Sequence, residues 1–286
     1  MSGKNEKKNM KEPKILLALD LDGTLVHHHQ PLHDDAKQVL EKLHRDGCLL
    51  LFATGRTPKW ALHCIRLSVP FFLVAYNGAV TYSWPEQEPI RTAFLTKADL
   101  KNLEHFIHVH GAVIHEAGGD ERVFYTPSRF KKDMLDHLEK RRKTTHERWE
   151  AIENIDEIPC TQIASVRFFS FPDQSEELSF DIQSQTQLSA PSMVDAFDDA
   201  YRVIQATGEM ASKGQALLAI REENPLLYVI AAGNDVNDID MLKRADYSIA
   251  VDDAALNVRE VAHVITPAEH ILDMLEQKVR QAKERL

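Results

Sequence analysis

Cysteine is scarce in this sequence of 286 residues, which contains only Cys48, Cys64 and Cys160. An odd number of cysteines without C-x-x-C spacing argues against a disulfide framework and against a structural zinc site. Free cysteine usually behaves as a small apolar residue. We therefore expect the three side chains to pack beside strands and helices.

The sequence also lacks long apolar runs and an excess of positive charge. No segment approaches the ~18 uninterrupted apolar residues of a membrane helix, and the lysine-rich residues 1–13 contain no apolar stretch of the kind found in signal peptides. The 44 acidic residues outnumber the 34 basic ones, for a formal net charge of -10, which disfavours general binding to nucleic acid or to anionic membranes. We expect a soluble, cytoplasmic protein with a disordered tail at residues 1–13 and no nucleic-acid or membrane partner.

Apolar residues are nonetheless abundant, at 43% of the chain, and they gather in short unbroken runs. Residues 14–20 contain such a run, of the kind that is buried on both faces of a parallel sheet. Segments with helical spacing at residues 34–45 and 59–67 separate this run from the next two. The alternation predicts an α/β fold with a doubly wound, Rossmann-like parallel sheet and right-handed crossovers. The core strands are expected at residues 14–20, 48–53, 71–76, 226–232 and 247–251.

A stretch of different character interrupts this alternation. Residues 82–190 contain a hairpin rich in turn residues, helices and short strands, and we interpret them as an inserted α+β domain. The core is then formed by residues 14–81 and 191–286. Two short strands, at residues 192–196 and 201–206, are expected to close the sheet of the inserted domain and to return the chain to the core.

Polar residues follow three of the predicted core strands. The segments Asp20–Thr24, Thr54–Arg56 and Gly233–Asp238 each come directly after a strand, and the carboxyl ends of parallel strands form the edge at which ligands bind. Asp20 and Asp22 can hold a divalent cation, and oxygen ligands of this kind suit magnesium. A carboxylate is also a competent nucleophile toward phosphorus, which would give an aspartyl-phosphate intermediate.

An anionic nucleophile beside a phosphate dianion requires positive charge. The repulsion is roughly 4 kcal/mol per charge pair at 4 Å and an effective dielectric constant near 20. Magnesium at Asp20 and the ammonium of Lys213, at the start of a predicted helix, can compensate it. Thr54 can donate its hydroxyl to the phosphate. Asp22 can protonate the leaving alkoxide and then accept a proton from water, a role worth about 10²–10⁴-fold in rate.

Five motifs occur in an order that is informative when they are taken together. They are Asp20–Thr24, Thr54–Arg56, Asn77–Ala79, Ser212–Gly214 and Gly233–Asp238, and in this order they resemble the signatures of the haloacid dehalogenase-like (HAD) hydrolases. Within that superfamily the chain looks like the Cof-type phosphatases, in which a large C2B cap is inserted between the third core strand and the lysine motif. The resemblance implies a magnesium-dependent phosphomonoester hydrolase that acts on a small phosphorylated metabolite.

The resemblance also implies roles for individual residues. Asp20 is expected to be the nucleophile, Asp22 the general acid and base, and Thr54 and Lys213 the phosphate binders. Magnesium is expected at Asp20, at the main-chain carbonyl of Asp22 and at the last loop. The candidate substrate-binding residues are Gly23, Thr24, Gly55, Arg56 and Asn77.

The last loop departs from the family pattern. Where the family has a metal-binding aspartate after the glycine, this chain has Asn234, followed by Asp235. Asn234 can bind magnesium through its amide oxygen with one charge fewer, or Asp235 can supply the carboxylate. Asp238 is also assigned to the metal site, behind the ligands or through water. Loss of catalysis is the third alternative.

Two other patterns have simpler interpretations. His27, His28 and His29 alternate in direction along an extended loop, and the oxygen-rich site beside them prefers a harder cation than imidazole does. We expect a solvated loop. The basic run at residues 140–143 is interpreted as a solvated helix face, because one short run on an acidic chain is a poor nucleic-acid footprint.

Two alternatives to hydrolysis stay open from the sequence. A phosphotransferase of the phosphosugar mutase type would return the phosphoryl group to a sugar instead of to water. A phosphate-binding or regulatory protein would keep the fold without turnover, in line with Asn234 in the last loop. Sugar phosphates, nucleotides and vitamin phosphates are all candidate substrates, and no oligomeric state is predicted.

Overall fold

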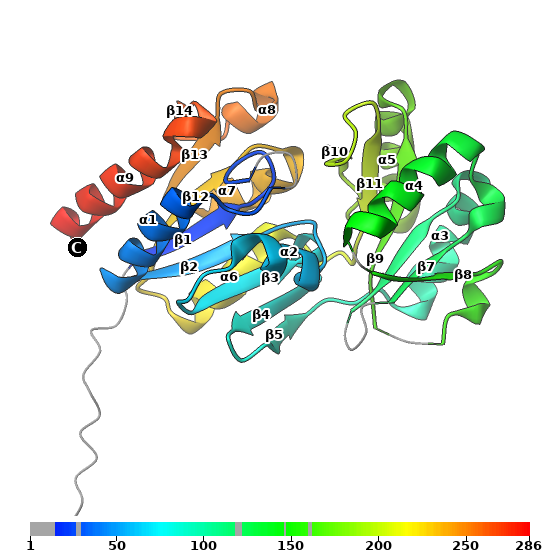
Figure 1. Cartoon of the computed structure of the whole chain (residues 1–286), viewed down its shortest axis with the longest axis horizontal. Helices are drawn as coiled ribbons and strands as arrows, with labels where there is room; N and C mark the ends of the chain where they lie inside the picture. The colour runs from blue at the N-terminus through cyan, green and yellow to red at the C-terminus, as the bar shows by residue number, and fades with distance from the viewer. Residues whose placement is uncertain (1–14, 27–29, 118–121, 146, 160–161) are drawn as a thin grey trace, which may run out of the picture.

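The computed structural model of the chain describes residues 15–26, 30–117, 122–145, 147–159 and 162–286. The described part forms two lobes, each built around one sheet (Figure 1). The predicted tail at residues 1–13, the three histidines His27, His28 and His29, and Cys160 lie outside the described residues.

The larger lobe, which we call the core, is built on an eight-stranded sheet with the order β14-β13-β12-β1-β2-β3-β4-β5. Neighbouring strands are parallel from β14 to β3, and β4 and β5 add an antiparallel hairpin at one edge. The strands are β1 (Ile15–Asp20), β2 (Cys48–Ala53), β3 (Phe71–Ala75), β4 (Val80–Trp84), β5 (Glu88–Thr92), β12 (Tyr228–Gly233), β13 (Tyr247–Val251) and β14 (Val264–Thr266).

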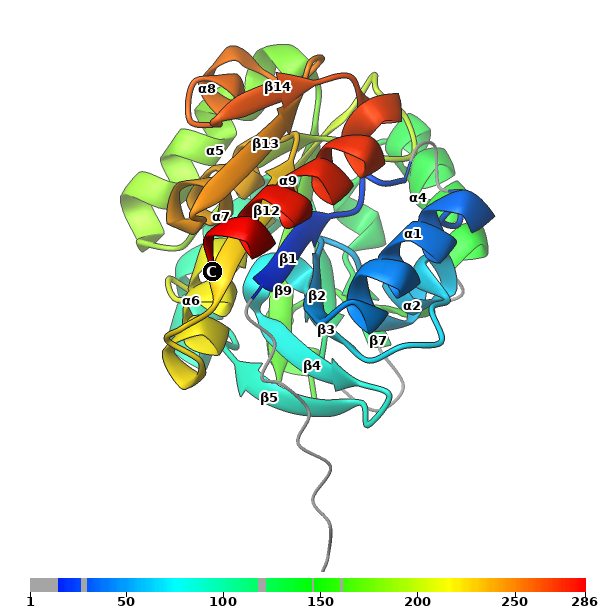
Figure 2. The same cartoon turned by 90° about the vertical axis from the view of Figure 1, so that its left-hand side faces the viewer.

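Helices cover both faces of the core sheet. Leu17 and Leu19 of β1 pack on one face, and Leu16 and Ala18 pack on the other, so the strand is an unbroken apolar run. Figure 2 shows α1 and α9 lying across the strands on the first face. The doubly wound sheet predicted from the sequence is therefore present. The helices of the first face are α1 (Asp34–Arg45), α2 (Pro58–Ile65) and α9 (Ile271–Arg285), and those of the second are α6 (Lys213–Glu223), α7 (Ile239–Arg244) and α8 (Leu256–Arg259).

The smaller lobe, which we call the cap, contains a six-stranded sheet with the order β10-β11-β9-β6-β7-β8. All of its strand pairs are antiparallel except β7 with β8. Helices α3 (Lys97–His110) and α5 (Pro172–Thr186) pack on one face, and α4 (Lys132–Thr145) packs on the other. The strands are β6 (Val113–Glu116), β7 (Arg122–Tyr125), β8 (Arg148–Ala151), β9 (Ile163–Ser170), β10 (Ser192–Val194) and β11 (Arg202–Ala206).

The division between the lobes differs from the predicted boundaries at both ends. Most of the β4–β5 hairpin falls in the predicted insertion at 82–190, yet it pairs with β3 in the core sheet. Strands β10 and β11 fall in the predicted core segment 191–286, yet they lie in the cap sheet, as expected of the two closing strands. The boundaries were placed where the local pattern changes, whereas membership of a sheet depends on which edge strand a hairpin pairs with.

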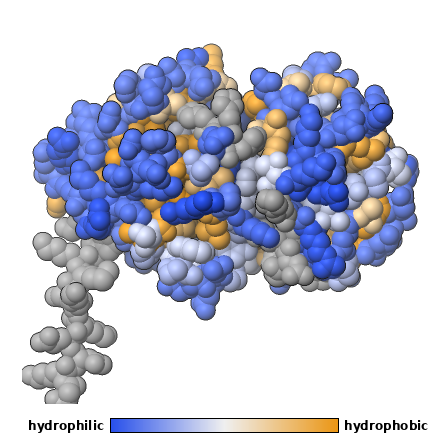
Figure 3. Space-filling view, in the orientation of Figure 1, coloured by the Kyte–Doolittle hydropathy of each residue, from blue (hydrophilic) through white to orange (hydrophobic). Residues whose placement is uncertain are grey.

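Hydrophilic side chains cover most of both lobes on the face shown in Figure 3. Within the described residues, no helix has the length and apolarity that crossing a bilayer requires. Cys48 and Cys64 are buried and free, as expected. Burial raises the pKa of the Cys48 thiol to about 11, so this side chain is an unreactive packing group at neutral pH.

A buried ion cluster ties α4 to the loop after β10. Asp195 lies 2.7 Å from Arg141 Nη1 and 3.0 Å from His137 Nε2, and it accepts a hydrogen bond of 2.7 Å from the Phe197 amide. The basic run at residues 140–143 is therefore not uniformly solvated, because Asp195 balances the charge of Arg141, which is only 5% exposed. Burial acts to raise the pKa of Asp195, but Arg141 and His137 lower it to about 2.

We predict that Asp195→Asn lowers the free energy of unfolding by about 3–5 kcal/mol at pH 7, because Arg141 stays buried without its countercharge. Since the pKa of Asp195 is lower in the folded than in the unfolded protein, this stabilisation is present above about pH 4 and is lost as the pH falls toward about 2. Urea unfolding at several pH values measures both effects. Asp199→Asn, an exposed residue in the same loop, is the control, and equal stability of the two variants at pH 7 would contradict the prediction.

Candidate active site

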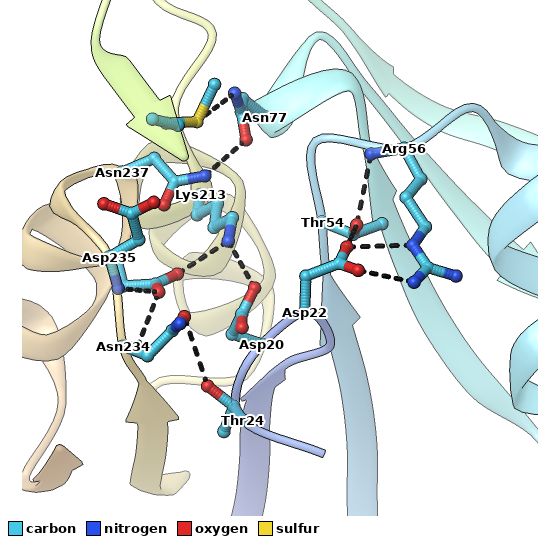
Figure 4. Close-up of polar contacts among 12 residues, drawn as sticks. Asp20, Asp22, Thr24, Thr54, Arg56, Asn77, Lys213, Asn234, Asp235 and Asn237 are labelled. Carbon is cyan, nitrogen blue, oxygen red and sulfur yellow. Dashed lines mark hydrogen bonds and ion pairs between the residues drawn. The ribbon is translucent and has the colours of Figure 1, made fainter. Parts of the chain in front are cut away.

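Residues from all five predicted motifs meet where the core strands end (Figure 4). Asp20 is the last residue of β1, Thr54 follows β2, and Gly233 is the last residue of β12. Lys213 is the first residue of α6. Because β1 lies between β2 and β12, the loops after these strands are neighbours at the edge of the sheet where ligands bind.

Lys213 joins two buried carboxylates. Its ammonium lies 2.6 Å from Asp20 Oδ1 and 2.6 Å from Asp238 Oδ1. Burial disfavours the charge of Lys213, but Asp20 and Asp238 together hold its pKa above the usual range. Burial, and next the Asp238 carboxylate, raise the pKa of Asp20 against the opposing effect of Lys213. A further cation beside Asp20 would therefore stabilise its ionised form.

Local backbone contacts hold Lys213 in this position. Ser212 is the N-cap of α6, and its hydroxyl accepts a hydrogen bond of 3.0 Å from the Gln215 amide. The turn that ends at Gly78 packs directly against Ser212. A Cβ atom on Gly78, whose φ is +103°, would lie 2.2 Å from the Ser212 carbonyl oxygen. A side chain at position 78 would thus displace the start of α6, and Lys213 with it.

Asp238 organises the last loop and does not face the site as a metal ligand would. Its Oδ1 is bound to Lys213, and its Oδ2 accepts hydrogen bonds from the amides of Asn234 at 2.9 Å and of Asp235 at 3.0 Å. The side chain is fully buried. Both oxygens are occupied, so Asp238 is not a direct metal ligand in this geometry; its place behind Asn234 and Asp235 is consistent with the predicted indirect role.

Asp22 and Arg56 form an ion pair beside Asp20. Arg56 Nε donates to Asp22 Oδ2 at 2.8 Å, and Arg56 Nη2 contacts Asp22 Oδ1. The guanidinium also contacts the Cys64 sulfur and lies over the Trp60 ring, 4.1 Å from its centroid. The hydroxyl of Thr54 donates to Asp22 Oδ2 at 3.4 Å and accepts from the Arg56 amide at 3.1 Å. Arg56 and Thr54 therefore position Asp22 in this conformation.

The oxygens left over around Asp20 fit a magnesium ion. Asp20 Oδ2 is buried and has no hydrogen-bond partner among the described residues. Gly23, with φ +81°, lets Asn234 approach, since a Cβ atom there would lie 2.0 Å from Asn234 Nδ2. Asp235 Oδ1 already accepts a hydrogen bond of 2.7 Å from the Val236 amide, and burial raises the pKa of Asp235. Asn234 Oδ1 in turn accepts a hydrogen bond of 3.5 Å from the Thr24 hydroxyl, and both Asn234 and Asp235 line the cavity beside Asp20, so both predicted candidates stay open.

The donor set is mixed in character. Among the described residues, no group of three or more histidine, cysteine, aspartate or glutamate side chains is placed to hold a metal ion. A site here would combine the carboxylate of Asp20, a side-chain oxygen of Asn234 or Asp235 and the main-chain carbonyl of Asp22 that was predicted as a ligand. Such hard oxygen donors, completed by water or substrate oxygens, are those that magnesium takes.

A cavity of about 80 Å³ lies between these residues and the cap. Gly55 and Arg56, two of the predicted substrate-binding residues, line it together with Asp20, Asp22 and Lys213. Three other predicted substrate-binding residues, Gly23, Thr24 and Asn77, do not, and neither does Thr54. The cap side of the cavity is formed by Arg141, Arg167, Met193, Val194, Ala196, Val203 and Gln205.

Asn77 connects the core to the cap. Its Nδ2 donates to Gln205 Oε1 of β11 at 3.1 Å, and its Oδ1 accepts from Asn237 Nδ2 of the last loop at 2.9 Å. The residue has φ +54° in the turn after β3, a conformation that asparagine tolerates better than most residues. The structure thus places Asn77 between the core, the cap and the last loop, and its substrate contact stays a prediction.

The sequence analysis missed the cap residues of the site. Arg167 Nη2 donates to the Gly55 carbonyl at 2.5 Å, and Gln205 Nε2 donates to the same oxygen at 3.4 Å. One signal was available, because Arg167 is the single charged residue in the apolar strand β9. A charge in a buried strand indicates a polar partner or a ligand.

Comparison with known proteins agrees with the fold. Residues 17–273 match the family model of haloacid dehalogenase-like hydrolases. Two Bacillus subtilis proteins, YxeH and the phosphatase YwpJ, are 24% and 23% identical to this chain over 88% of its length, which covers 92% and 94% of their own lengths.

Solved structures share the complete fold at low sequence identity. A haloacid dehalogenase-like hydrolase from B. subtilis superposes with a TM-score of 0.74 at 18% identity, covering 90% of this chain and 98% of its own. The subclass IIB sugar phosphatase BT4131 has a TM-score of 0.72 at 17% identity, covering 92% of this chain and 98% of its own.

A doubly wound core with a cap over clustered acidic loops and a buried lysine defines an enzyme of the hydrolase class. The chain belongs to the haloacid dehalogenase-like hydrolase family. The predicted fold class and the resemblance read from the motifs are both confirmed.

We predict that Asp238→Asn, which keeps the shape of the side chain, lowers the free energy of unfolding by about 3 kcal/mol. The reason is that asparagine keeps one acceptor oxygen instead of two, so its NH2 group must face either the Lys213 ammonium or the amides of Asn234 and Asp235, which are donors left without an acceptor. Urea denaturation at pH 7 measures the change. Asp252→Asn, an exposed residue after β13, serves as the control. A variant as stable as the control would show that Lys213 does not depend on Asp238.

Proposed function

We propose that this protein is a magnesium-dependent phosphatase that hydrolyses a small phosphomonoester through an aspartyl-phosphate on Asp20. The observation that carries the proposal is the pairing of Asp20 Oδ1 with buried Lys213 while Asp20 Oδ2 stays without a partner among the described residues. A buried carboxylate held by one cation, with one oxygen free, is arranged to attack an electrophile and to share a second cation.

The protein groups have separate tasks in this reaction. Lys213 fixes the Asp20 carboxylate and lies close enough to it to compensate the charge of an incoming phosphate. An oxygen of Asp20 forms the new bond to phosphorus as the bond to the leaving oxygen breaks. Asp22, oriented by Arg56, gives a proton to that oxygen and later takes one from the water that hydrolyses the aspartyl-phosphate. Magnesium, when bound, supplies positive charge at the phosphate oxygens.

The small cavity and the cap over it support a compact substrate. The cap covers a cavity of about 80 Å³, which leaves no room for a polymer in this arrangement. One structural relative is a sugar phosphatase, and this favours a sugar phosphate among the sugar phosphate, nucleotide and vitamin phosphate classes. Entry of such a substrate requires the cap to move away from the Thr54–Arg56 loop, which it contacts through Arg167.

We predict that Asp20→Asn lowers phosphate release from p-nitrophenyl phosphate by at least about 10³-fold, because the amide cannot attack phosphorus. Removing magnesium with EDTA lowers the wild-type rate similarly, and adding magnesium back restores it. The exposed Asp253→Asn variant should keep the wild-type rate.

Two results would contradict the proposal. Equal rates for Asp20→Asn and the wild type would exclude Asp20 as the nucleophile. Interconversion of sugar phosphate isomers without release of phosphate would favour the phosphotransferase alternative instead.

A second prediction concerns the unusual residue of the last loop. Asn234→Asp adds one negative charge beside Asp20 and should strengthen magnesium binding about tenfold, since ligand charge is a main determinant of affinity at such sites. Calorimetric titration with magnesium alone measures this without turnover. Asn102→Asp, on the exposed face of α3, provides the same change in net charge. Equal affinities for the two variants would remove Asn234 from the metal site.

A further inference from the structure

Four basic side chains line the cavity between core and cap, and they differ in how their charges are balanced. Three of them have carboxylate partners, and these pairs are Arg56 with Asp22, Arg141 with Asp195, and Lys213 with Asp20 and Asp238. The fourth, Arg167, forms no ion pair with an acidic side chain in the part of the chain that the structure describes. Among the described residues, Glu147 and Asp195 of the cap act on its charge only from a distance.

Burial of the Arg167 guanidinium removes it from water, and this loss of hydration costs free energy unless a ligand replaces the water. The residue is 4% exposed, and its Nε is buried with no hydrogen-bond partner among the described residues. Among the described residues, its hydrogen bond runs from Nη2 to the carbonyl of Gly55. Burial, and next the like charge of Arg141, lower the pKa of Arg167 to about 10. The guanidinium therefore stays charged at neutral pH, and its Nε–H group makes no hydrogen bond among the described residues.

Arg167 lines the cavity from the cap, whereas Asp20 and Asp22 line it from the core. Arg167 lies on β9, in register with Gln205 of β11 and Val113 of β6, on the sheet face that carries α4. A molecule bound in this cavity would meet the carboxylates of Asp20 and Asp22 on the core side and the guanidinium of Arg167 on the cap side.

We propose that Arg167 binds a second anionic group of the substrate, a carboxylate or a further phosphate, at a distance from the phosphate that is removed. This inference rests on the proposed phosphatase function. Guanidinium groups bind both anions through charged hydrogen bonds. The donor at Arg167 Nε is available for such a bond. Gln205 is the residue of β11 that pairs with Arg167 in the cap sheet, and its side-chain amide donates to the same Gly55 carbonyl.

Two pairs of substrates test the proposal and distinguish the two anions. Fructose 1,6-bisphosphate is compared with fructose 6-phosphate, and 3-phosphoglycerate is compared with glycerol 3-phosphate, with p-nitrophenyl phosphate as a substrate without a second anion. We expect the wild type to show a kcat/KM at least about tenfold higher for the anion-bearing member of one pair. In Arg167→Met this preference should fall by about 10- to 100-fold, the usual weight of a charged hydrogen bond. Arg202→Met, on β11 of the same sheet, removes a charge that contacts only backbone carbonyls and should keep the preference.

Several outcomes would overturn the inference. One is a wild type without preference in either pair. Another is an Arg167→Met variant that loses activity as strongly on p-nitrophenyl phosphate as on the preferred substrate, since Arg167 would then bind the transferred phosphate.

Binding measurements separate this inference from the proposed function. Calorimetry with the Asp20→Asn variant compares the affinities for fructose 1,6-bisphosphate, fructose 6-phosphate, 3-phosphoglycerate and glycerol 3-phosphate without any turnover. Suppose that the wild type hydrolyses none of the substrates, while Asp20→Asn binds one member of a pair more tightly and Arg167→Met removes that preference. This combination would support the anion site and reject the phosphatase. Hydrolysis without a preference in either assay would reject the anion site alone.

Stability gives an independent readout. Replacing an uncompensated buried charge should leave the melting temperature of Arg167→Met at or above that of the wild type. Arg141→Met instead breaks a buried ion pair and should lower it. A loss in Arg167→Met as large as that in Arg141→Met would show a structural role and overturn the proposal.

Discussion

The site depends on one buried ammonium group between two carboxylates. Asp20 ends β1 and Asp238 lies in the loop after β12, and without Lys213 their charges would repel each other in a buried space. The same Asp238 holds the amides of Asn234 and Asp235. Lys213 therefore sets the positions of three chain segments at once, and the close contact of Gly78 with Ser212 sets the position of Lys213. The geometry around the nucleophile is thus a consequence of charge neutralisation in the core.

A column of stacked groups extends this arrangement to the cap. Arg56 lies 4.1 Å from the centroid of the Trp60 ring, and the Trp60 and Phe197 ring centroids are 5.2 Å apart. Arg141 lies 4.3 Å from the Phe197 centroid on the cap side. Each arginine is also held by its own carboxylate, Asp22 in the core and Asp195 in the cap. Contacts between core and cap are therefore linked to the residue that orients Asp22.

Sequence reasoning predicted the parts of this structure that are encoded locally. An apolar run followed by an acidic loop was enough to place Asp20 at the end of β1, because strand and motif are adjacent in the chain. The partners of Asp22 and the ion pair of Asp238 with Lys213 were not predicted, since contacts between distant loops leave no periodic signal. The β4–β5 hairpin was assigned to the wrong lobe for the same reason. The assignment of Arg141 to a solvated helix face was wrong because its partner, Asp195, lies 54 residues further along the chain.

Arg167, which has no ion-pair partner among the described residues, couples substrate binding to the position of the cap. In the closed arrangement Arg167 is buried, and its contact with the Gly55 carbonyl compensates only part of the lost hydration. An open cap would return the guanidinium to water, so closure over an empty site is disfavoured by the cost of burying an unpaired charge. An anion bound at Arg167 would remove that cost. Because the anion would bind the closed form more tightly than the open form, it would shift the equilibrium between them toward the closed form. The same residue would then select the substrate and favour the closed state in which Asp20 is shielded from bulk water.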